Sequence, residues 1–302
     1  MSYCTVFPSR MFKPRSVEDN FAAQREAARE AGFSTFLLDQ EHLDQGNFAR
    51  AARGVEEGIG ASIYRGWMIT VDQYARLHAA LSERAAPPIN SPAQYLHCHH
   101  LPESFDIIRA QSPGAVWVPL GPEGIDIDQV IVAAAEFGDA PVVIKDYVKS
   151  RKHEWEDACF VPSAANRDDL RRVVSTFIER QDLLAGGIVV REFRELESIG
   201  IHPKSGMPLT REHRVFVLDG EPVAVGRYWS DGEYANEDVP LSDFADTMKV
   251  VKSRFFTMDL ARQADGQWCI IELGDGQVAG LLGTIPETEF FASLASKLAV
   301  VG

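Results

Sequence analysis

Alternating and continuous apolar runs in the first 88 residues predict strands that are separated by amphipathic helices. Strands are expected over residues 2–9, 33–39 and 61–64, and helices over residues 17–30 and 70–81. We expect Ser16 to cap the first helix and Gly32 to stop it, and Thr70 to cap the second. Strand–helix–strand order at this spacing predicts a small parallel α/β unit that ends near Pro87 and Pro88.

The rest of the chain has a different pattern, with strands that follow one another directly. Apolar runs predict single strands in residues 115–120, 141–148, 158–162 and 186–193, and helices over residues 127–137 and 167–182. Two hairpins are expected, because Asp219-Gly220 and Asp265-Gly266 each lie between β-rich runs. This order predicts an α+β region with antiparallel sheets.

Composition and charge narrow the classes of function. The chain has 302 residues, 45% of them hydrophobic and 25% charged, as in an ordinary globular protein. Its formal net charge of −14 argues against general binding to nucleic acid or to an anionic membrane. Basic residues nevertheless recur at 145–152, 191–194 and 204–214, which leaves room for a positive pocket that binds a phosphate-bearing ligand.

Cellular location is also constrained by the sequence. The four cysteines are widely spaced and form no CxxC pair, so we expect buried, reduced thiols. The N-terminus lacks a cationic run followed by an apolar signal core, and no apolar run approaches the roughly 20 residues needed to span a bilayer. The sequence predicts a cytoplasmic protein.

The last predicted hairpin carries the clearest candidate chemistry. Asp259 lies in its first strand and Glu272 in the returning strand, so the two carboxylates converge if register and face agree. Mg²⁺ takes one or two carboxylates together with substrate phosphates. Asp275 follows in a glycine-rich turn. On spacing alone, solvated carboxylates on an ordinary hairpin remain an open alternative.

Cationic residues within apolar strands are the second set of candidates. Lys145 lies in the run VVIK, and its ammonium must either reach water along its stem or find an anion such as phosphate. Arg214 and Arg227 occupy the two arms of the Asp219-Gly220 hairpin and suit phosphate or carboxylate recognition. The alternatives are that Lys145 simply extends its stem to water, and that the two arginines pair across the strands with Glu212 or another acid.

Two further segments carry polar candidates. GGIVVREF leads into Glu192, Phe193, Glu195 and Glu197, where backbone can bind an adenine edge and a carboxylate can accept from ribose hydroxyls, although a solvated acidic turn fits equally. Cys98 and its neighbouring histidines are too close in sequence to converge on one metal, so we expect a polar loop that lines a cleft: His97, His99 and His100.

Taken in order, these segments resemble the ATP-grasp superfamily of carboxylate ligases, from about residue 89 to residue 285. PVVIKDYV resembles the strand whose lysine contacts the α- and β-phosphates, and GIVVREF resembles the strand that enters the adenine hinge. EHRVFVLDGEPVAVGRYW resembles the hairpin that supplies an arginine, and MDLARQADGQWCIIELGDGQ resembles the terminal Asp…Glu-x-Asn metal motif. YRGWM, KDYVKS and ELGDGQVAGL are similar to phrases in a group of bacterial and phage ATP-grasp proteins.

The resemblance implies a set of site residues and one fold. It places Lys145, Lys149, Glu192, Phe193, Glu195, Glu197 and Arg214 at ATP, and Asp259, Glu272 and Asp275 at Mg²⁺. Lys145, Arg214 and Arg227 would be catalytic, with Arg65 and Arg227 at the substrate. The fold would be the ATP-grasp fold, with an N-terminal α/β domain at 1–88 and an ATP-grasp domain at 89–302, divided into a lid at 125–190 and a metal-binding part at 191–302.

Two departures from the family pattern affect these expectations. Gly274 stands where the metal motif commonly has Asn, so Asp275 or Gln277 would have to replace that ligand. The region of the family's early lysine has none here, so the phosphate contact either comes from Lys149 or Lys152 or is missing.

The function that the resemblance implies is an ADP-forming, ATP- and Mg²⁺-dependent ligase. It would activate a small-molecule or peptide carboxylate as an acyl phosphate, which an amine or another nucleophile then attacks. A homodimer is left open. The alternatives are a nucleotide-binding sensor or scaffold without catalysis, and a kinase-like phosphotransferase.

Overall fold

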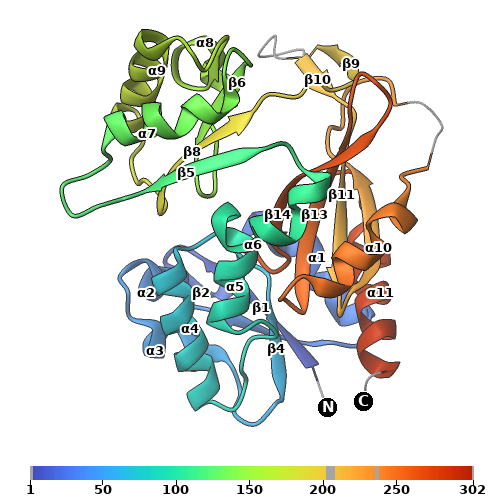
Figure 1. Cartoon of the computed structure of the whole chain (residues 1–302). Coiled ribbons are helices and arrows are strands. Elements are labelled where there is room, and N and C mark those ends of the chain that lie inside the picture. Colours follow the sequence, from blue (N-terminus) through green and yellow to red (C-terminus); the bar gives the residue numbers. More distant parts are fainter. Residues whose placement is uncertain (1–2, 202–207, 235–237, 301–302) are drawn as a thin grey trace.

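The computed structural model describes residues 3–201, 208–234 and 238–300. Part of the basic stretch at 204–214 therefore lies outside the described residues. Three four-stranded sheets and one two-stranded ribbon are present, arranged as an N-terminal unit, a lid that projects away from it, and a C-terminal sheet beside both (Figure 1). The described helices include none that is both long enough and apolar enough to cross a bilayer.

The strands have these bounds: β1 Tyr3–Arg10, β2 Lys13–Val17, β3 Ser34–Leu38, β4 Ala61–Tyr64, β5 Ala115–Pro119, β6 Val142–Asp146, β7 Phe160–Val161, β8 Gly187–Glu192, β9 Ser198–Ile201, β10 Pro208–Thr210, β11 Glu212–Leu218, β12 Glu221–Arg227, β13 Phe255–Arg262 and β14 Trp268–Asp275.

The α-helices have these bounds: α1 Ala22–Glu30, α2 Gln40–Asp44, α3 Phe48–Ala51, α4 Val71–Glu83, α5 Pro92–His99, α6 Leu101–Ile108, α7 Ile127–Ala134, α8 Trp155–Ala158, α9 Arg167–Glu179, α10 Leu241–Val250 and α11 Glu287–Val300. Short 3₁₀ turns are η1 Asp19–Phe21, η2 Ala52–Gly54, η3 Arg109–Gln111, η4 Ala135–Phe137 and η5 Lys152–Glu154.

The N-terminal unit confirms the predicted parallel α/β arrangement. β1 pairs in parallel with β3 and with β4, and antiparallel with β2. Thr70 caps α4 in a capping box with Gln73, as expected. The helix predicted over 17–30 starts instead at Ala22, because the chain turns at Phe12 (φ 58°) and pairs back on β1, which places Ser16 within β2.

The lid is an antiparallel sheet in the order β5-β8-β6-β7, with α7 and α9 packed on one face. Side chains alternate along β6, so Val142 and Ile144 enter the lid core while Lys145 lies on the opposite face. In the register of β6 and β8, Lys145 pairs with Val189, and Val143 pairs with Arg191. The lid sheet therefore presents Lys145 and Arg191 on the same face, away from its own core.

The C-terminal sheet is antiparallel in the order β12-β11-β13-β14. Asp219 and Gly220 both have positive φ, so the β11–β12 hairpin turns as its Asp-Gly pair predicts. Phe7 and Ile63 of the N-terminal unit share one apolar core with Phe216, Phe255 and Phe290. Residues 1–88 are therefore packed on the C-terminal sheet through a common core and not only through a linker.

Candidate active site

Three charged residues form one row across the C-terminal sheet. Arg214 on β11 pairs in register with Asp259 on β13, and Asp259 pairs with Glu272 on β14. Directly paired residues share one face of a sheet. The two carboxylates predicted to converge therefore do so, beside the arginine of the first hairpin.

Arg214 and Asp259 form a bidentate ion pair. Nε of Arg214 lies 2.8 Å from Oδ1 of Asp259, and its second terminal nitrogen lies 2.7 Å from Oδ2. Burial raises the pKa of the Asp259 carboxyl, against the opposing charge of Arg214. Burial acts to lower the pKa of Arg214, but the charge and hydrogen bonds of Asp259 outweigh burial, so the pKa of Arg214 is raised overall. The guanidinium also lies 5.2 Å from the ring centre of Tyr228.

Glu272 differs from its neighbour because its carboxylate has no hydrogen-bond or ion-pair partner among the residues that the structure describes. The side chain is half-buried. Its negative charge favours the protonated form of five surrounding groups, which come from both sheets and from the lid loop: Lys145, Lys152, Arg191, Arg214 and Tyr228. Glu272 is thus the common counter-charge of a cationic site.

The lid contributes Lys145 and Arg191 to this site. Lys145 is 5% exposed and donates a hydrogen bond of 3.3 Å to the carbonyl of Val148. Burial lowers its pKa, while the charge of Glu272 acts in the opposite direction. Arg191 donates to the carbonyls of Ile270 and Ile271 on β14 and so joins the lid sheet to the strand that carries Glu272.

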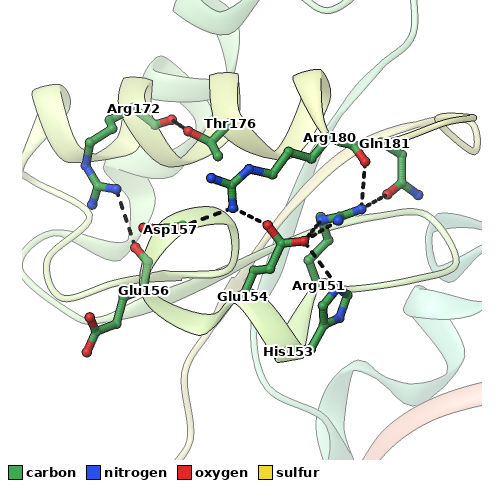
Figure 2. Close-up of polar contacts among 9 residues, drawn as sticks. All are labelled: Arg151, His153, Glu154, Glu156, Asp157, Arg172, Thr176, Arg180 and Gln181. Carbon is green, nitrogen blue, oxygen red and sulfur yellow. Dashed lines mark hydrogen bonds and ion pairs between the residues drawn. The ribbon is translucent and has the colours of Figure 1, made fainter. Parts of the chain in front are cut away.

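Lys152 reaches the site from the segment that follows β6. The charge of Glu212 raises the pKa of Lys152, and the charge of Glu272 adds to the increase. Figure 2 shows how the segment is held: Glu154 pairs with Arg151 and with Arg180 of α9, and Arg151 donates 2.8 Å to the carbonyl of Arg180. The segment that carries Lys152 is therefore anchored to the end of α9 by residues on both sides of that lysine.

A cavity of about 720 Å³ opens beside these charges, between the lid and the C-terminal region. Lys152 and Glu212 lie at its edge, and three aromatic side chains line it, Trp155, Phe193 and Trp229. Trp155 lies 5.9 Å from Phe193, ring centre to ring centre. The cavity has the size and the apolar lining typical of a small-ligand site, with charged groups at one side.

Only two of the four residues proposed for ATP binding at the end of β8 and after it lie at the cavity. Phe193 and Glu195 line the cavity. Glu192 instead accepts a 3.1 Å hydrogen bond from the backbone of Gly114 and pairs with Arg194. Glu197 lies 2.7 Å from Arg262 and 3.4 Å from Arg211. Both of these carboxylates bind neighbouring groups of the protein and are not presented to the cavity.

Asp275 occupies a place different from the one expected for a metal ligand. It pairs in register with Phe256, whereas Glu272 pairs with Asp259, so the two acids lie on opposite faces of β14. Its carboxylate accepts hydrogen bonds from Asn90 (2.6 Å) and from the backbone and side chain of Gln277. Gln277 in turn donates 2.7 Å to the hydroxyl of Tyr74. Asp275 therefore joins the N-terminal unit to the C-terminal sheet.

Neither expected substrate arginine reaches the row of charges. Arg65 is 1% exposed, binds Gln24 and the carbonyls of residues 276 and 277, and lies 5.4 Å from the ring centre of Phe290. Arg227 pairs in register with His213, one position from Arg214, and so projects from the other face of the sheet. Its guanidinium lies 5.1 Å from the ring centre of Tyr234.

Gly274 pairs in register with Thr257, on the face that carries Glu272. A Cβ atom at position 274 would lie 2.7 Å from Oγ1 of Thr257. The space in which the family commonly has an asparagine is therefore taken up by the threonine of the neighbouring strand.

Lys149 and the histidines lie on the far side of Lys145. Lys149 is exposed and lines a second cavity, together with His99 and His100. The histidines were expected in a loop, but Pro92–His99 form α5, which a Ser91 capping box starts. The four cysteines are buried and free, as expected.

Sequence reasoning missed Arg191, Glu212 and Tyr228. Arg191 is the only charged residue in the run GGIVVR. Strand alternation places it on the same face as Lys145, which is the sequence signal that could have identified it. Glu212 and Tyr228 lie at opposite ends of the first hairpin and meet through its register, since the amide of Tyr228 donates to the carbonyl of Glu212. The hairpin register is a local signal for this meeting, but the position of both residues near Glu272 has no such signal, because it depends on the pairing of β11 with β13.

The donor set fits Mg²⁺. The described residues contain no group of three acidic, histidine or cysteine side chains placed to hold a metal by themselves. Mg²⁺ does not need such a cage, because one or two carboxylates together with phosphate oxygens and water complete its octahedron. Glu272 offers an unpartnered carboxylate, and Asp259 stands directly beside it across the strand pair.

Comparison with known proteins agrees with this architecture. The profile of the ATP-grasp domain of R₂K clade family 3 matches residues 136–294, more than half of the chain. No curated protein matches the sequence.

Solved structures resemble it at low identity. A RimK-domain ATP-grasp protein from Sphaerobacter thermophilus superimposes with a TM-score of 0.62 at 14% identity, covering 98% of each chain. The ATP-grasp ligase PsnB, complexed with a minimal precursor, Mg and ADP, gives 0.57 at 15% identity, covering 98% of this chain and 97% of its own. D-alanyl-alanine synthetase A from Vibrio cholerae gives 0.58 at 11% identity, covering both chains fully.

At these identities the likeness shows the fold, which is the ATP-grasp fold, and the profile match shows the family. Lys145, Arg191, Arg214, Asp259 and Glu272 all lie within the matched residues. The chain therefore belongs to family 3 of the R₂K clade of ATP-grasp proteins.

Proposed function

We propose that this protein is an ATP- and Mg²⁺-dependent ligase that activates a carboxylate as an acyl phosphate and passes it to a nucleophile. The observation that carries the proposal is the unpartnered carboxylate of Glu272, which faces Lys145 and Lys152 of the lid and stands in one row with Asp259 and Arg214. Unpaired charges of both signs in one cleft are costly to the fold and suit a ligand that brings phosphates and a metal.

The cavity of about 720 Å³ would hold the adenosine part of ATP. Trp155 and Phe193 offer ring surfaces for the base, and Glu195 offers a carboxylate to ribose hydroxyls. Lys152 lines the cavity and is also within reach of the charge of Glu272, so the phosphates would extend from Lys152 toward Lys145.

The charged residues would then act mainly by position. Lys145 and Lys152 would neutralise phosphate oxygens, and Arg214 would hold the transferred group while it remains paired with Asp259. Glu272 and Asp259 would hold Mg²⁺, which when bound offsets the charge that develops on the phosphates. Attack of the substrate carboxylate on the γ-phosphate forms a new P–O bond and releases ADP. A nucleophile then forms a bond to the acyl carbon, and phosphate leaves.

Structural neighbours support this class of reaction. PsnB is described in complex with a precursor peptide, and other neighbours are named D-cycloserine synthetase and D-alanyl-alanine synthetase A. We therefore place peptide and small-molecule acids first among the substrates to be screened.

The test is isothermal titration of ATP, with and without Mg²⁺, into the wild-type protein and into Lys145→Ala and Glu272→Gln. We expect metal-dependent binding in the wild type, a loss of affinity in Lys145→Ala, and binding without metal dependence in Glu272→Gln. Candidate acids are then screened for ADP release. Full turnover by Glu272→Gln would show that the site assignment is wrong.

A nucleotide-binding sensor without catalysis is the second candidate, and one observation favours it. Thr257 fills the space of the family's asparagine ligand, and Asp259 is already paired with Arg214, so a two-metal site has few free oxygens. Mg²⁺-dependent ATP binding without ADP release across the whole panel of acids and amines would support the sensor.

A further inference from the structure

A second cavity of about 700 Å³ has a lining that shares no residue with the proposed nucleotide cavity. It opens between residues 68–73, which lead into α4 of the N-terminal unit, and residues 181–186 of the lid. Val148 lines it, and the carbonyl of Val148 accepts the hydrogen bond of Lys145. Lys145 itself lines neither cavity, but this hydrogen bond places its ammonium directly behind the wall of the second one.

Two histidines at the end of α5 form part of the wall. Within the described residues, the rings of His99 and His100 have no hydrogen-bond partner. Their nitrogens are not fully buried either, so they are accessible from the cavity. Burial lowers the pKa of His99 to about 3, and it lowers the pKa of His100 as well. Both rings are therefore neutral at pH 7, and each offers an acceptor nitrogen.

The mouth of the cavity is apolar. Met68 and Leu183, which face it from the two sides, are 43% and 65% exposed. Ile69 and Val71 extend the apolar lining inward. Large exposed apolar side chains that gather at one opening are typical of a surface that binds a ligand.

The charges around this cavity favour a cation over an anion. Its acids are Asp72, Asp146 and Asp182, and its bases are Lys149 and Arg151. Asp146 accepts from four groups of the protein, and Arg151 is paired with Glu154. The two acids left at the rim outnumber the one remaining lysine, unlike the cationic cleft around Glu272.

We propose that the second cavity binds the nucleophile of the ligase reaction, and that this nucleophile is a primary amine next to an apolar group, such as the amino end of an apolar peptide. The ammonium donates to the neutral ring of His100, and the adjoining apolar side chain packs between Met68 and Leu183. This inference rests on the proposed ligase function and adds the class of acceptor to it.

Two matched probes test the assignment. L-leucyl-L-leucinamide carries an amine and no carboxylate, and N-acetyl-L-leucyl-L-leucine carries a carboxylate and no amine. Each is titrated into the wild-type protein in the presence of Mg²⁺ and a non-hydrolysable ATP analogue, whose own binding is measured first. We expect the amide to bind and the acetylated acid to bind at least about tenfold more weakly, because the rim carries excess negative charge.

Charge variants at the rim give the sign of the bound group. Leu183→Lys is expected to bind the amide at least about fivefold more weakly than Leu183→Glu, because the two variants differ by two units of charge at a position near the bound ammonium. Val132→Lys and Val132→Glu are the control pair, since Val132 is 67% exposed on α7 and lines neither cavity. His100→Phe should weaken binding of the amide, and His100→Asn, which keeps an acceptor, should restore most of it.

The outcomes separate the two proposals. If the nucleotide analogue fails to bind, the proposed function itself is overturned. If the analogue binds but the dipeptide amide does not, or if the acetylated acid binds better, the amine assignment alone is overturned. Equal affinity of the amide for Leu183→Lys and Leu183→Glu would also overturn it.

Discussion

Glu272 and Asp275 are two acids on one strand, three residues apart, with opposite surroundings. Glu272 is half-buried, faces cations from both sheets and has no hydrogen-bond partner among the described residues. Asp275 is 1% exposed and accepts hydrogen bonds from Asn90 and Gln277 at the interface with the N-terminal unit. The Glu272 carboxylate is free to bind a ligand, whereas the Asp275 carboxylate is already hydrogen-bonded to groups of the protein.

The difference shows how residues that bind a ligand can be told apart from residues that hold the fold together. A buried polar group whose hydrogen bonds are complete holds the structure together, whereas a charge left without a partner costs stability unless a ligand supplies one. Two buried cations differ in the same way: Lys145 donates a single 3.3 Å hydrogen bond, to the carbonyl of Val148, whereas Arg65 binds Gln24 and the carbonyls of residues 276 and 277. The following predictions test the contrast, from the largest expected effect to the smallest.

Exchanging the two acids for their amides should give opposite results. Glu272→Gln is expected to lower ATP turnover by about 100-fold or more, because it removes a charge that binds the metal and the phosphates. Its Tm should stay close to that of the wild type. Asp275→Asn should keep nucleotide affinity per folded molecule, measured by titration. Loss of metal-dependent binding in Asp275→Asn with an unchanged Tm would reverse the assignment.

Asn90→Ala should destabilise the protein by about 2–4 kcal/mol, measured by urea unfolding. The Asn90 amide donates to Asp275 and to the carbonyl of Phe255, and its oxygen accepts from the amide of Phe255, so truncation leaves several buried groups unpaired. Asn20→Ala is the matched control, since Asn20 is exposed. A similar small change in both variants would contradict the structural role of the interface.

Lys145→Met should raise stability while it weakens ATP binding. Burial lowers the pKa of Lys145, so its charge is held at a cost when no phosphate is present. We expect a gain of about 1 kcal/mol in the free energy of unfolding and at least a tenfold loss in ATP affinity. Lys149→Met is the control, because Lys149 is exposed. A loss of stability in Lys145→Met would place Lys145 with the scaffold.

Asp275 should also make stability depend on pH. Burial raises its pKa from 3.8 to about 6, although Asn90 and Gln277 donate hydrogen bonds to it. Between pH 6 and pH 4 the native state therefore binds a proton that the unfolded state does not, so this group's contribution to stability rises as the pH falls through 6. From pH 7 to pH 5 the wild type should gain ~1 kcal/mol relative to Asp275→Asn. Parallel unfolding curves for the two proteins would contradict this pKa.

The smallest expected effect concerns the family's asparagine position. Gly274→Asn should cost ~0.5 to 1 kcal/mol, because its Cβ would lie 2.7 Å from Oγ1 of Thr257 and force that side chain away from its preferred rotamer. The double variant Gly274→Asn/Thr257→Gly should recover part of that stability. If the single variant is as stable as the wild type, Thr257 does not fill this space.

Local patterns determined much of the architecture. Strand alternation and the Asp219-Gly220 turn predicted the first hairpin, and Thr70 as a cap predicted the start of α4. The second hairpin predicted that Asp259 and Glu272 converge if register and face agree, and the structure pairs them, because the register of two strands joined by a short turn is largely a local property. The false helix start near Ser16 arose where the chain turns back on β1, a pairing that no local signal announces.

Only the tertiary structure decided which charged residues meet and which are taken up by the scaffold. Asp275 lies in a glycine-rich turn and Arg65 follows a predicted strand, and the packing of the N-terminal unit on β14 encloses both. Arg191 and Lys152 reach Glu272 because the lid folds over a sheet about 80 to 120 residues further along the chain. The sequence by itself determined the strands, the turns and the residue types of the site, since these depend on neighbouring positions. Burial and charge partners depend on contacts between distant segments, and for that reason only the folded chain reveals them.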